Sequence, residues 1–522
     1  MSAQNHKDKV TIRIQRYNPD TDENPYFEEF QVGRMPGKTV LDALLEIKGE
    51  QDGSLTFRRS CRHGICGSCA MNVNGTNKLA CESTLEDHTN KDGLITIRPL
   101  SYVPVVKDLV TDRGSFWDQY LRIKPWLIPP EEVPEKEFRI PPEEVSTLGN
   151  AERCIMCGVC YSACPVISVN QKFLGPHALL KAFLRVSDTR DKAPDEHLEE
   201  IATVWDCTTC YMCDSQCPKD LDPGQVSKTL RSMQVEKGSV PRTIGTALTS
   251  TFRYKNPFEM AHAKRLEWAE GLSLLNVQEE SVDALYFVCC IACYDPRAQK
   301  IPQAMVAAMD SAGVRLGTLG SEEACCGSDV RRMGEVGLYE MMVEEQTETL
   351  KAAGPQQIVT TSPHCFDAYK NHYPDLEFKT EHYTQFVARL IADGRLAFKR
   401  KLKKRVTYHD PCYLGIQNNV FEEPRAILRS IPGVELVEME RSAEKSLCCG
   451  GGGGRMWFEG HDTEVHLAHE RMHEAIATGA QILATACPFC LNMLDAAAKS
   501  VALDDQIEVK DIMELVVDAI EP

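Results

Sequence analysis

Cysteine is the residue that most constrains this chain. The sequence holds 23 cysteines in 522 residues, mostly in C-x-x-C or C-C units. Neighbouring cysteines such as Cys448 and Cys449 make a poor disulfide, because consecutive Cα atoms are only about 3.8 Å apart. The first residues, MSAQNHKDKV, contain no apolar signal core, which favours a reducing compartment. We therefore predict that these cysteines bind metal rather than form disulfides.

The net charge and the hydropathy limit the kinds of partner that the protein can bind. A net charge of -18 repels nucleic acid, so no nucleic-acid partner is expected. The longest apolar run, residues 284–294, is about half as long as a bilayer-spanning helix. We expect a cytoplasmic protein, with peripheral attachment to the cytoplasmic face of the membrane as the alternative. The basic run KRKLKKR at 399–405 is interpreted as a solvated linker, and docking on an acidic partner or membrane surface is the alternative.

Hydrophobic periodicity predicts an α+β multidomain protein. Short strands flank one helix in the first hundred residues, helix-like segments separate the next cysteines, and a strand-turn-helix pattern repeats in the last 240 residues. The segment PPEEVPEKEFRIPPEEV is rich in proline and glutamate and reads as an extended connector. The expected domains are a small mixed α+β domain (8–105), a linker (106–148), a helical domain (149–237), a connector (238–280) and two repeated α/β lobes (281–398 and 405–522).

The first cysteine cluster has the spacing of plant-type 2Fe-2S ferredoxins, C-x4-C-x2-C and a distant fourth cysteine. Its ligands would be Cys61, Cys66, Cys69 and Cys81. Gly64 and Gly67 let the loop curl so that backbone amides point at the sulfurs. A zinc site is the less favoured interpretation.

Two later runs share the spacing C-x2-C-x2-C-x3-C-P, in which the fourth cysteine ligates the other cluster. The predicted ligands of one 4Fe-4S centre are Cys154, Cys157, Cys160 and Cys217. Those of the other are Cys164, Cys207, Cys210 and Cys213.

Residues 8–237 resemble the iron-sulfur subunit of succinate dehydrogenase and fumarate reductase, through CRHGICGSCAMNVNG, the first CP run, KFLGP and CPKDLDPG. The resemblance implies a β-grasp 2Fe-2S domain, a helical double-cluster ferredoxin domain and a flavoprotein partner that carries FAD and the dicarboxylate chemistry. Cys210 departs from the family, whose usual members lack a cysteine there, and predicts a complete 4Fe-4S cluster. PVISVNQ after Cys164 replaces the tryptophans of the usual quinone pocket.

The last 240 residues look like the CCG domains of heterodisulfide reductase, in which a distant cysteine, a CC pair and a CxxC hold a non-cubane 4Fe-4S cluster. The second lobe has the complete set, Cys412, Cys448, Cys449, Cys487 and Cys490. The first lobe supplies Cys290, Cys325, Cys326 and Cys365, but Ser362 stands where the first cysteine of CPxC belongs. Cys289 and Cys293 are extra: either Cys293 replaces the missing ligand, or the lobe carries a simpler cluster or none.

Two further features lie near these motifs. The run GGGGG at 450–454 satisfies a nucleotide-loop pattern trivially and has no following lysine, so nucleotide binding is disfavoured. His364 and His409 adjoin the cysteine motifs and would deliver protons at a reducing site, but local hydrogen bonding is the preferred interpretation.

A chain of such centres conducts single electrons. We expect an electron-transfer subunit of a succinate dehydrogenase/fumarate reductase-type complex that relays electrons between the flavoprotein and a quinone or a membrane subunit. One alternative is a thiol:fumarate reductase subunit, which the fused architecture resembles and which would exchange electrons with dithiols at the CCG cluster. The other is a non-catalytic redox scaffold.

Overall fold

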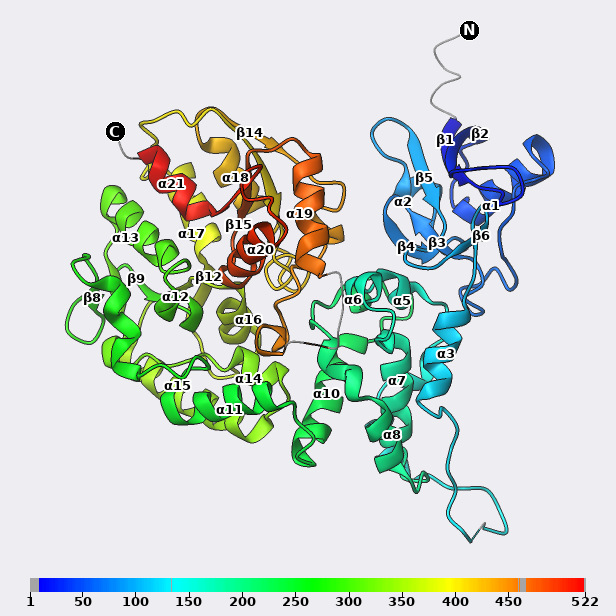
Figure 1. Cartoon of the computed structure of the whole chain (residues 1–522), viewed down its shortest axis with the longest axis horizontal. Coiled ribbons are helices and arrows are strands. Elements are labelled where there is room, and N and C mark those ends of the chain that lie inside the picture. Colours follow the sequence, from blue (N-terminus) through cyan, green and yellow to red (C-terminus); the bar gives the residue numbers. More distant parts are fainter. Residues whose placement is uncertain (1–8, 133, 459, 461–465, 521–522) are drawn as a thin grey trace. The chain divides into compact units, whose positions relative to one another are not determined.

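A computed structural model describes residues 9–132, 134–458, 460 and 466–520 (Figure 1). The chain forms two compact units by its internal contacts. Unit 1 runs to Val204 and includes Tyr211–Leu230, whereas unit 2 contains Trp205–Cys210 and everything from Arg231 onward. The chain therefore passes between the units three times.

Unit 1 begins with a mixed five-stranded sheet in the order β2-β1-β5-β3-β4. Its core is apolar because alternate residues of β1, such as Val10, Ile12 and Ile14, point inward and are buried. Thr39 and Asp42 form a capping box that starts the covering helix α1. The elements are β1 (Lys9–Arg16), β2 (Tyr26–Gly33), α1 (Val40–Glu46), η1 (Ile47–Gln51), β3 (Ala70–Val73), β4 (Thr76–Leu79), α2 (Leu85–His88) and β5 (Leu94–Arg98).

The rest of unit 1 is a β-hairpin followed by short helices. The elements between residues 105 and 236, of which η4 and α10 continue into unit 2, are β6 (Val105–Lys107), β7 (Val110–Thr111), α3 (Gly114–Arg122), α4 (Pro142–Val145), η2 (Ser146–Leu148), η3 (Ala151–Arg153), α5 (Val159–Ala163), α6 (Pro165–Val169), α7 (Gly175–Val186), α8 (Pro194–Glu200), η4 (Ala202–Asp206), α9 (Met212–Ser215) and α10 (Pro223–Glu236). The expected linker over 106–148 is thus partly structured, since β7 and α3 lie within it. Helix α3 forms there because Phe116 is buried and stacks on His177 of α7.

The first lobe of unit 2 has a sheet in the order β12-β11-β9-β10-β8, all parallel. Strand β9 is buried along its whole length, as expected for a parallel sheet covered on both faces. Two helices, α11 (Arg242–Tyr254) and η5 (His262–Ala269), occupy the expected connector. The lobe contains β8 (Leu275–Asn276), β9 (Ala284–Phe287), α12 (Cys290–Tyr294), α13 (Lys300–Ala312), β10 (Leu316–Thr318), α14 (Ser328–Arg332), α15 (Val336–Ala353), β11 (Gln357–Thr360), α16 (Pro363–Asn371), β12 (Lys379–His382) and α17 (Tyr383–Ala392).

The second lobe repeats this plan with a parallel sheet in the order β14-β13-β15-β16. Its elements are β13 (Lys404–His409), α18 (Glu422–Ser430), β14 (Val434–Val437), η8 (Arg455–Trp457), α19 (Leu467–Ala477), β15 (Ile482–Thr485), α20 (Pro488–Ser500), β16 (Glu508–Asp511) and α21 (Ile512–Ile520). The multidomain fold class, a β-sheet ferredoxin domain, a helical region and two parallel-sheet lobes, is confirmed.

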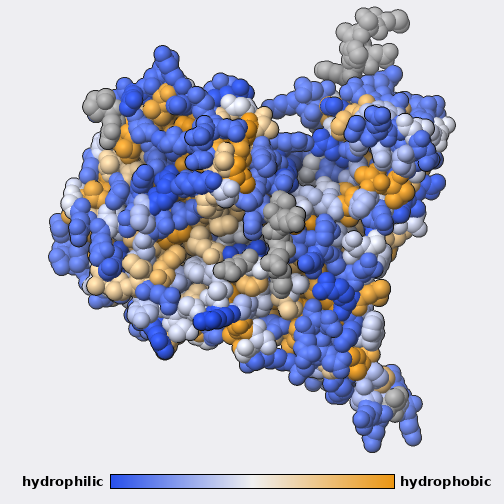
Figure 2. Space-filling view, viewed as in Figure 1, coloured by the Kyte–Doolittle hydropathy of each residue, from blue (hydrophilic) through white to orange (hydrophobic). Residues whose placement is uncertain are grey.

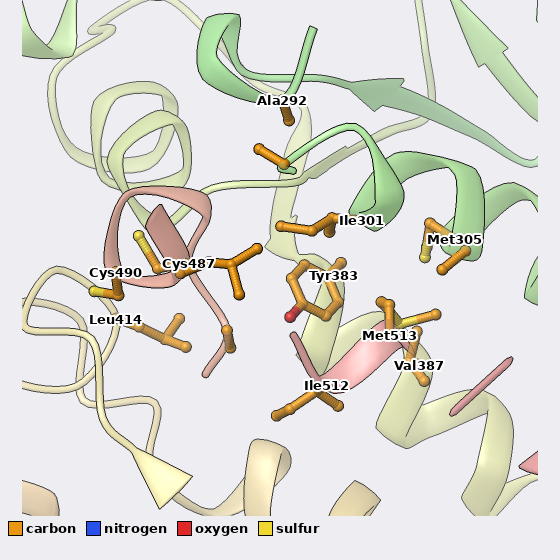
Figure 3. Close-up of a cluster of buried hydrophobic side chains, with 14 of the residues drawn as sticks. Ala292, Ile301, Met305, Tyr383, Val387, Leu414, Cys487, Cys490, Ile512 and Met513 are labelled. Carbon is orange, nitrogen blue, oxygen red and sulfur yellow. The ribbon is translucent and has the colours of Figure 1, made fainter. Parts of the chain in front are cut away.

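One hydrophobic core joins the two lobes. Helix α13 packs on α21, and α17 packs on α18. Figure 3 shows Tyr383, Val387, Ile512 and Met513 gathered in this core, with Cys487 beside it. The Tyr383 hydroxyl lies within hydrogen-bonding distance of both carboxylate oxygens of Asp511, at 2.8 and 3.0 Å. The two halves of the repeat are therefore one folding unit.

Hydrophilic residues cover most of the visible face in Figure 2, with scattered apolar patches. Among the described residues no helix is both long and apolar enough to cross a membrane.

Candidate metal centres

The loop between α1 and β3 holds most of the first cysteine set. Its backbone amides point at the sulfurs: the amide of Cys66 lies 3.3 Å from Sγ of Cys61, and that of Gly64 lies 3.3 Å from Sγ of Cys81. Gly64 and Gly67 have φ of 63° and 68°, which only glycine adopts without strain. The predicted curl of the loop is confirmed. Such N–H···S bonds favour the more negative, reduced state of a cluster.

Gly67 also brings this loop close to the next cysteine set. A Cβ on Gly67 would lie 2.7 Å from the Cα of Cys157, so a side chain there would push the two loops apart. The four cysteines Cys154, Cys157, Cys160 and Cys217 are mutual neighbours in unit 1. Burial, together with the neighbouring thiols, raises the pKa of Cys157 to about 11. Crowded buried thiols of this kind are costly to ionise unless a cationic metal holds them.

The predicted ligands of the other 4Fe-4S centre are divided between the two units. Cys164 and Cys213 belong to unit 1, and Cys207 and Cys210 belong to unit 2. The amide of Thr209 lies 3.4 Å from Sγ of Cys207. In unit 2, Cys210 is close enough to Cys412 to raise the pKa of that thiol, which Cys448 and burial raise more strongly. The Cys207–Cys210 loop and the second-lobe set are therefore neighbours within one unit.

The second lobe brings its five predicted cysteines together. Cys412 lies just after β13, and Cys448 and Cys449 lie in the segment between β14 and η8. Cys487 and Cys490 lie at the N-terminus of α20. Cys412 interacts with Cys448, and Cys449 interacts with Cys448 and Cys490. Burial would raise the pKa of Cys487, but hydrogen bonds from Cys490 and His364 lower it to about 5. The pKa of Cys449 is lowered as well, chiefly by Cys448 and Cys490. Five converging thiols, two of them with lowered pKa values, fit an iron-sulfur core.

The five glycines after Cys449 let two backbones meet. A Cβ on Gly452 would lie 2.8 Å from the carbonyl oxygen of Thr208, and one on Gly453 would lie 3.0 Å from that of Cys207. Gly453 also has φ of 63°. The buried guanidinium of Arg231 donates to the carbonyl oxygens of Gly453 at 2.8 Å and of Cys207 at 2.6 Å. The glycine run thus fits against the Cys207–Cys210 ligand loop, a role that the sequence pattern did not predict.

His409 lies against the second-lobe thiols. One ring nitrogen of His409 and the Sγ atoms of Cys449 and Cys490 all lie within 4.8 Å of one another. Its Nδ1 accepts a hydrogen bond from Nε of Arg471 at 3.1 Å, and Arg471 can only donate. The proton of the neutral ring is therefore on Nε2, which is buried and has no partner among the described residues. Because Arg471 occupies the Nδ1 lone pair, the neutral ring of His409 has no free lone pair for a metal in this arrangement.

His364 of the first lobe reaches the second-lobe set. Its ring is stacked between Tyr413 and Phe489, each at 4.1 Å between centroids. Its Nδ1 lies 3.4 Å from the Asp329 carboxylate. Burial alone would lower the pKa of His364, but Asp329 and Cys487 raise it to about 10. His364 thus contacts Asp329 of its own lobe and Cys487 of the other, and the local hydrogen bonding favoured by the sequence stays a prediction.

The first-lobe cysteines also converge. Sγ of Cys326 lies 3.4 Å from Sγ of Cys365, and the Cys365 thiol also interacts with Cys289. Cys325 interacts with Cys290 on one side and Cys326 on the other. The thiols thus form a continuous buried row, in the order Cys290, Cys325, Cys326, Cys365 and Cys289.

Comparison with known proteins agrees with this domain order. Residues 11–118 match a model described as 2Fe-2S iron-sulfur cluster binding domain, residues 150–221 match a 4Fe-4S dicluster domain, and residues 284–368 and 406–495 match a cysteine-rich domain. The chain is 30% identical to a subunit of the fumarate reductase (CoM/CoB) of Methanothermobacter marburgensis, over 97% of this chain and 98% of that one.

Two bacterial relatives are longer proteins. The EtfAB:quinone oxidoreductase of Syntrophomonas wolfei is 30% identical over 71% of this chain and 58% of its own length. The probable iron-sulfur-binding oxidoreductase FadF of Bacillus subtilis is 34% identical over 61% of this chain and 46% of its own length. The chain thus spans about half the length of these two relatives.

Proposed function

Since the chain belongs to the family of iron-sulfur oxidoreductase proteins that includes this fumarate reductase (CoM/CoB) subunit, we propose that it is the electron-transfer subunit of a succinate dehydrogenase/fumarate reductase-type complex. It would relay electrons between a flavoprotein subunit and a terminal acceptor. Bound clusters supply one-electron carriers. The chain supplies the thiolates, the N–H donors and the close packing that keep the carriers apart from water.

The packing of Trp205–Cys210 against the second lobe carries this proposal. The Thr209 hydroxyl and the Tyr413 hydroxyl are 2.8 Å apart, and Tyr413 directly follows the predicted ligand Cys412. Nε2 of Gln417 donates to the Thr209 carbonyl at 3.1 Å. Together with the Gly453 contact, these bonds hold the Cys207–Cys210 loop against the loop of Cys412. Fixed proximity of two ligand loops is what electron transfer between their centres requires.

The other end of the proposed relay is the 2Fe-2S loop. Ile65 is 68% exposed and Cys66 is also exposed, while Cys69 of the same loop is buried. An apolar side chain presented beside a cluster ligand suits docking of a protein partner. We assign this loop to the flavoprotein, which would carry the FAD and the dicarboxylate chemistry.

Two redox partners are compatible with the C-terminal end of the proposed relay. A quinone, reached directly or through a membrane subunit, is supported by the relative named as a quinone oxidoreductase. A dithiol is supported by the relative that matches over nearly its whole length, whose name specifies CoM and CoB, and by the complete five-cysteine set of the second lobe. In the dithiol case the chain would take two electrons from two thiols as one disulfide forms, and pass them singly toward fumarate reduction.

The test is anaerobic purification of the chain with its bound partners, followed by two assays. Succinate oxidation coupled to a quinone supports the quinone acceptor, and fumarate reduction by dithiols supports the thiol acceptor. A preparation with full iron and sulfide that catalyses neither reaction would overturn the proposed complex and favour a redox scaffold. Colourless protein containing zinc would remove the electron-transfer role altogether.

A further inference from the structure

The first lobe departs from the second at one ligand position. Strand pairing aligns the two lobes: Phe287 faces Thr360 across β9 and β11, and His409 faces Thr485 across β13 and β15. Counting onward along each chain, Ser362 occupies the position of Cys487. The Ser362 hydroxyl accepts a hydrogen bond from the His364 amide at 3.2 Å and caps α16. It is therefore engaged with its own helix.

The same alignment shows where a replacement thiol lies. Cys290 takes the position of Cys412, so Cys289 takes the position of Pro411. Cys289 is 2% exposed, and its thiol is next to that of Cys365. The thiol lost at Ser362 is thus matched by a thiol gained at Cys289, and the row in the first lobe again has five members.

Cys293 is the other unassigned cysteine, and its thiol lies near Cys289 and Cys290 but also contacts a backbone carbonyl. It lies one helical turn beyond Cys289 in α12, and its Sγ is 3.5 Å from the carbonyl oxygen of Val288. Sγ of Cys293 thus lies beside a backbone carbonyl oxygen, whereas the thiol of Cys289 lies beside that of Cys365. The geometry favours Cys289 over Cys293 as the fifth ligand.

A buried cation faces this row. Arg265 of η5 is 1% exposed, and its Nη1 donates to Sγ of Cys290 at 3.3 Å. Its Nη2 binds the Val288 carbonyl at 2.7 Å and the Glu323 carboxylate at 2.9 Å. Burying a guanidinium is costly unless negative groups surround it. The Glu323 carboxylate is one such group, and the sulfur of Cys290 lies beside the Nη1 that Glu323 does not bind. Arg265 fits a site that is anionic when filled.

We propose that the first lobe holds its own iron-sulfur centre, ligated by Cys289, Cys290, Cys325, Cys326 and Cys365, with Cys293 outside the ligand set. This inference deepens the proposed electron-transfer function and rests on it. It adds one more centre to the relay, next to the lobe that carries Cys412.

The experiment compares serine variants of the full chain, purified anaerobically, by iron and acid-labile sulfide content and by the EPR signals of each centre. Cys326→Ser shows how much iron and sulfide the protein loses when the first-lobe centre is absent. Cys289→Ser should lose the same amount of iron, whereas the matched variant Cys293→Ser should keep the wild-type amount. Ser362→Cys in the Cys289→Ser background should recover the iron, because it restores the ligand pattern of the second lobe.

Four results would overturn the inference. Cys326→Ser with undiminished iron would show that the first lobe holds no centre. Cys289→Ser with full iron, or Cys293→Ser with the same loss as Cys326→Ser, would show that the ligand set is different. The EPR signal of the second-lobe centre reports whether unit 2 of each variant is folded, and the 2Fe-2S signal reports the same for unit 1. If the wild-type chain shows the clusters of residues 61–217 and 412–490 but only these, the proposed function stands and this inference fails.

Discussion

Nε of Arg471 donates to Nδ1 of His409 at 3.1 Å, and both side chains are buried. The two residues are 62 positions apart, so the pair exists only in the fold. It fixes which ring nitrogen carries the proton, in a ring that lies beside the predicted ligands Cys449 and Cys490.

His409→Phe should lower the reduction potential of the second-lobe centre. The variant removes an N–H donor that favours the reduced cluster. One hydrogen bond of about 1 kcal/mol corresponds to roughly 40 mV for a one-electron couple. An EPR-monitored redox titration measures the shift. His469→Phe, on the surface of α19, is the control, and an unchanged potential in His409→Phe would contradict the assigned donor.

Gly453→Ala should disturb the loop of Cys207. The new Cβ would meet backbone atoms of Cys207 and Thr208 at 3.0 Å, and the left-handed φ adds about 1 kcal/mol of strain. Gly394→Ala is the matched control, since Gly394 has φ of 70° and no described atom lies within 4 Å of the place that a methyl group would take. We expect a larger loss of thermal stability and of iron in Gly453→Ala than in Gly394→Ala. Equal losses would mean that the close approach of the two loops is unimportant.

Arg332→Leu should strongly destabilise unit 2. Nη2 of Arg332 lies 2.5 Å from the Asp367 carboxylate, both side chains are buried, and the guanidinium stacks over Tyr413 at 3.8 Å. Removing one partner leaves a buried charge, at a cost of about 3–5 kcal/mol. Lys499→Leu, which breaks the more exposed pair with Asp495, should cost less than about 1 kcal/mol. Anaerobic denaturant unfolding of both variants makes the comparison, and similar midpoints would contradict it.

Asp511 should make stability depend on pH. Burial raises the pKa of Asp511 to about 8, although the Met513 amide and Tyr383 lower it. The folded state therefore holds a proton that the unfolded chain releases near pH 4, and this contribution is lost as pH rises from about 4 to 8. Relative to Asp511→Asn, the wild type should be more stable at pH 5 than at pH 9. Thermal melts across this range measure the difference, and parallel curves for the two proteins would refute it.

Much of the fold was predictable because parallel strands and metal loops leave local signals. The apolar runs before Cys290 and Cys412 mark β9 and β13, and the C-x-x-C spacings mark the ligand loops. The structured part of the linker was not predictable, since α3 forms through the distant contact of Phe116 with His177.

The candidate site was predictable where its residues lie in motifs and not elsewhere. Arg265 and Arg231 sit in ordinary helical sequence, and only the fold brings them to Cys290 and Cys207. Cys289 and Cys293 look alike in the sequence, because both lie close to Cys290. What separates them is the direction of each thiol, which depends on the turn from β9 into α12.

The three passages of the chain between the units bear on how the protein can be dissected. No single peptide bond divides it into its two compact parts, because residues 205–210 fold with the C-terminal half while 211–230 return to the N-terminal half. A fragment ending near residue 237 would carry Cys207 away from Gly453. A single truncation in this region would therefore remove residues from both units, so the protein cannot be cut into two intact domains there.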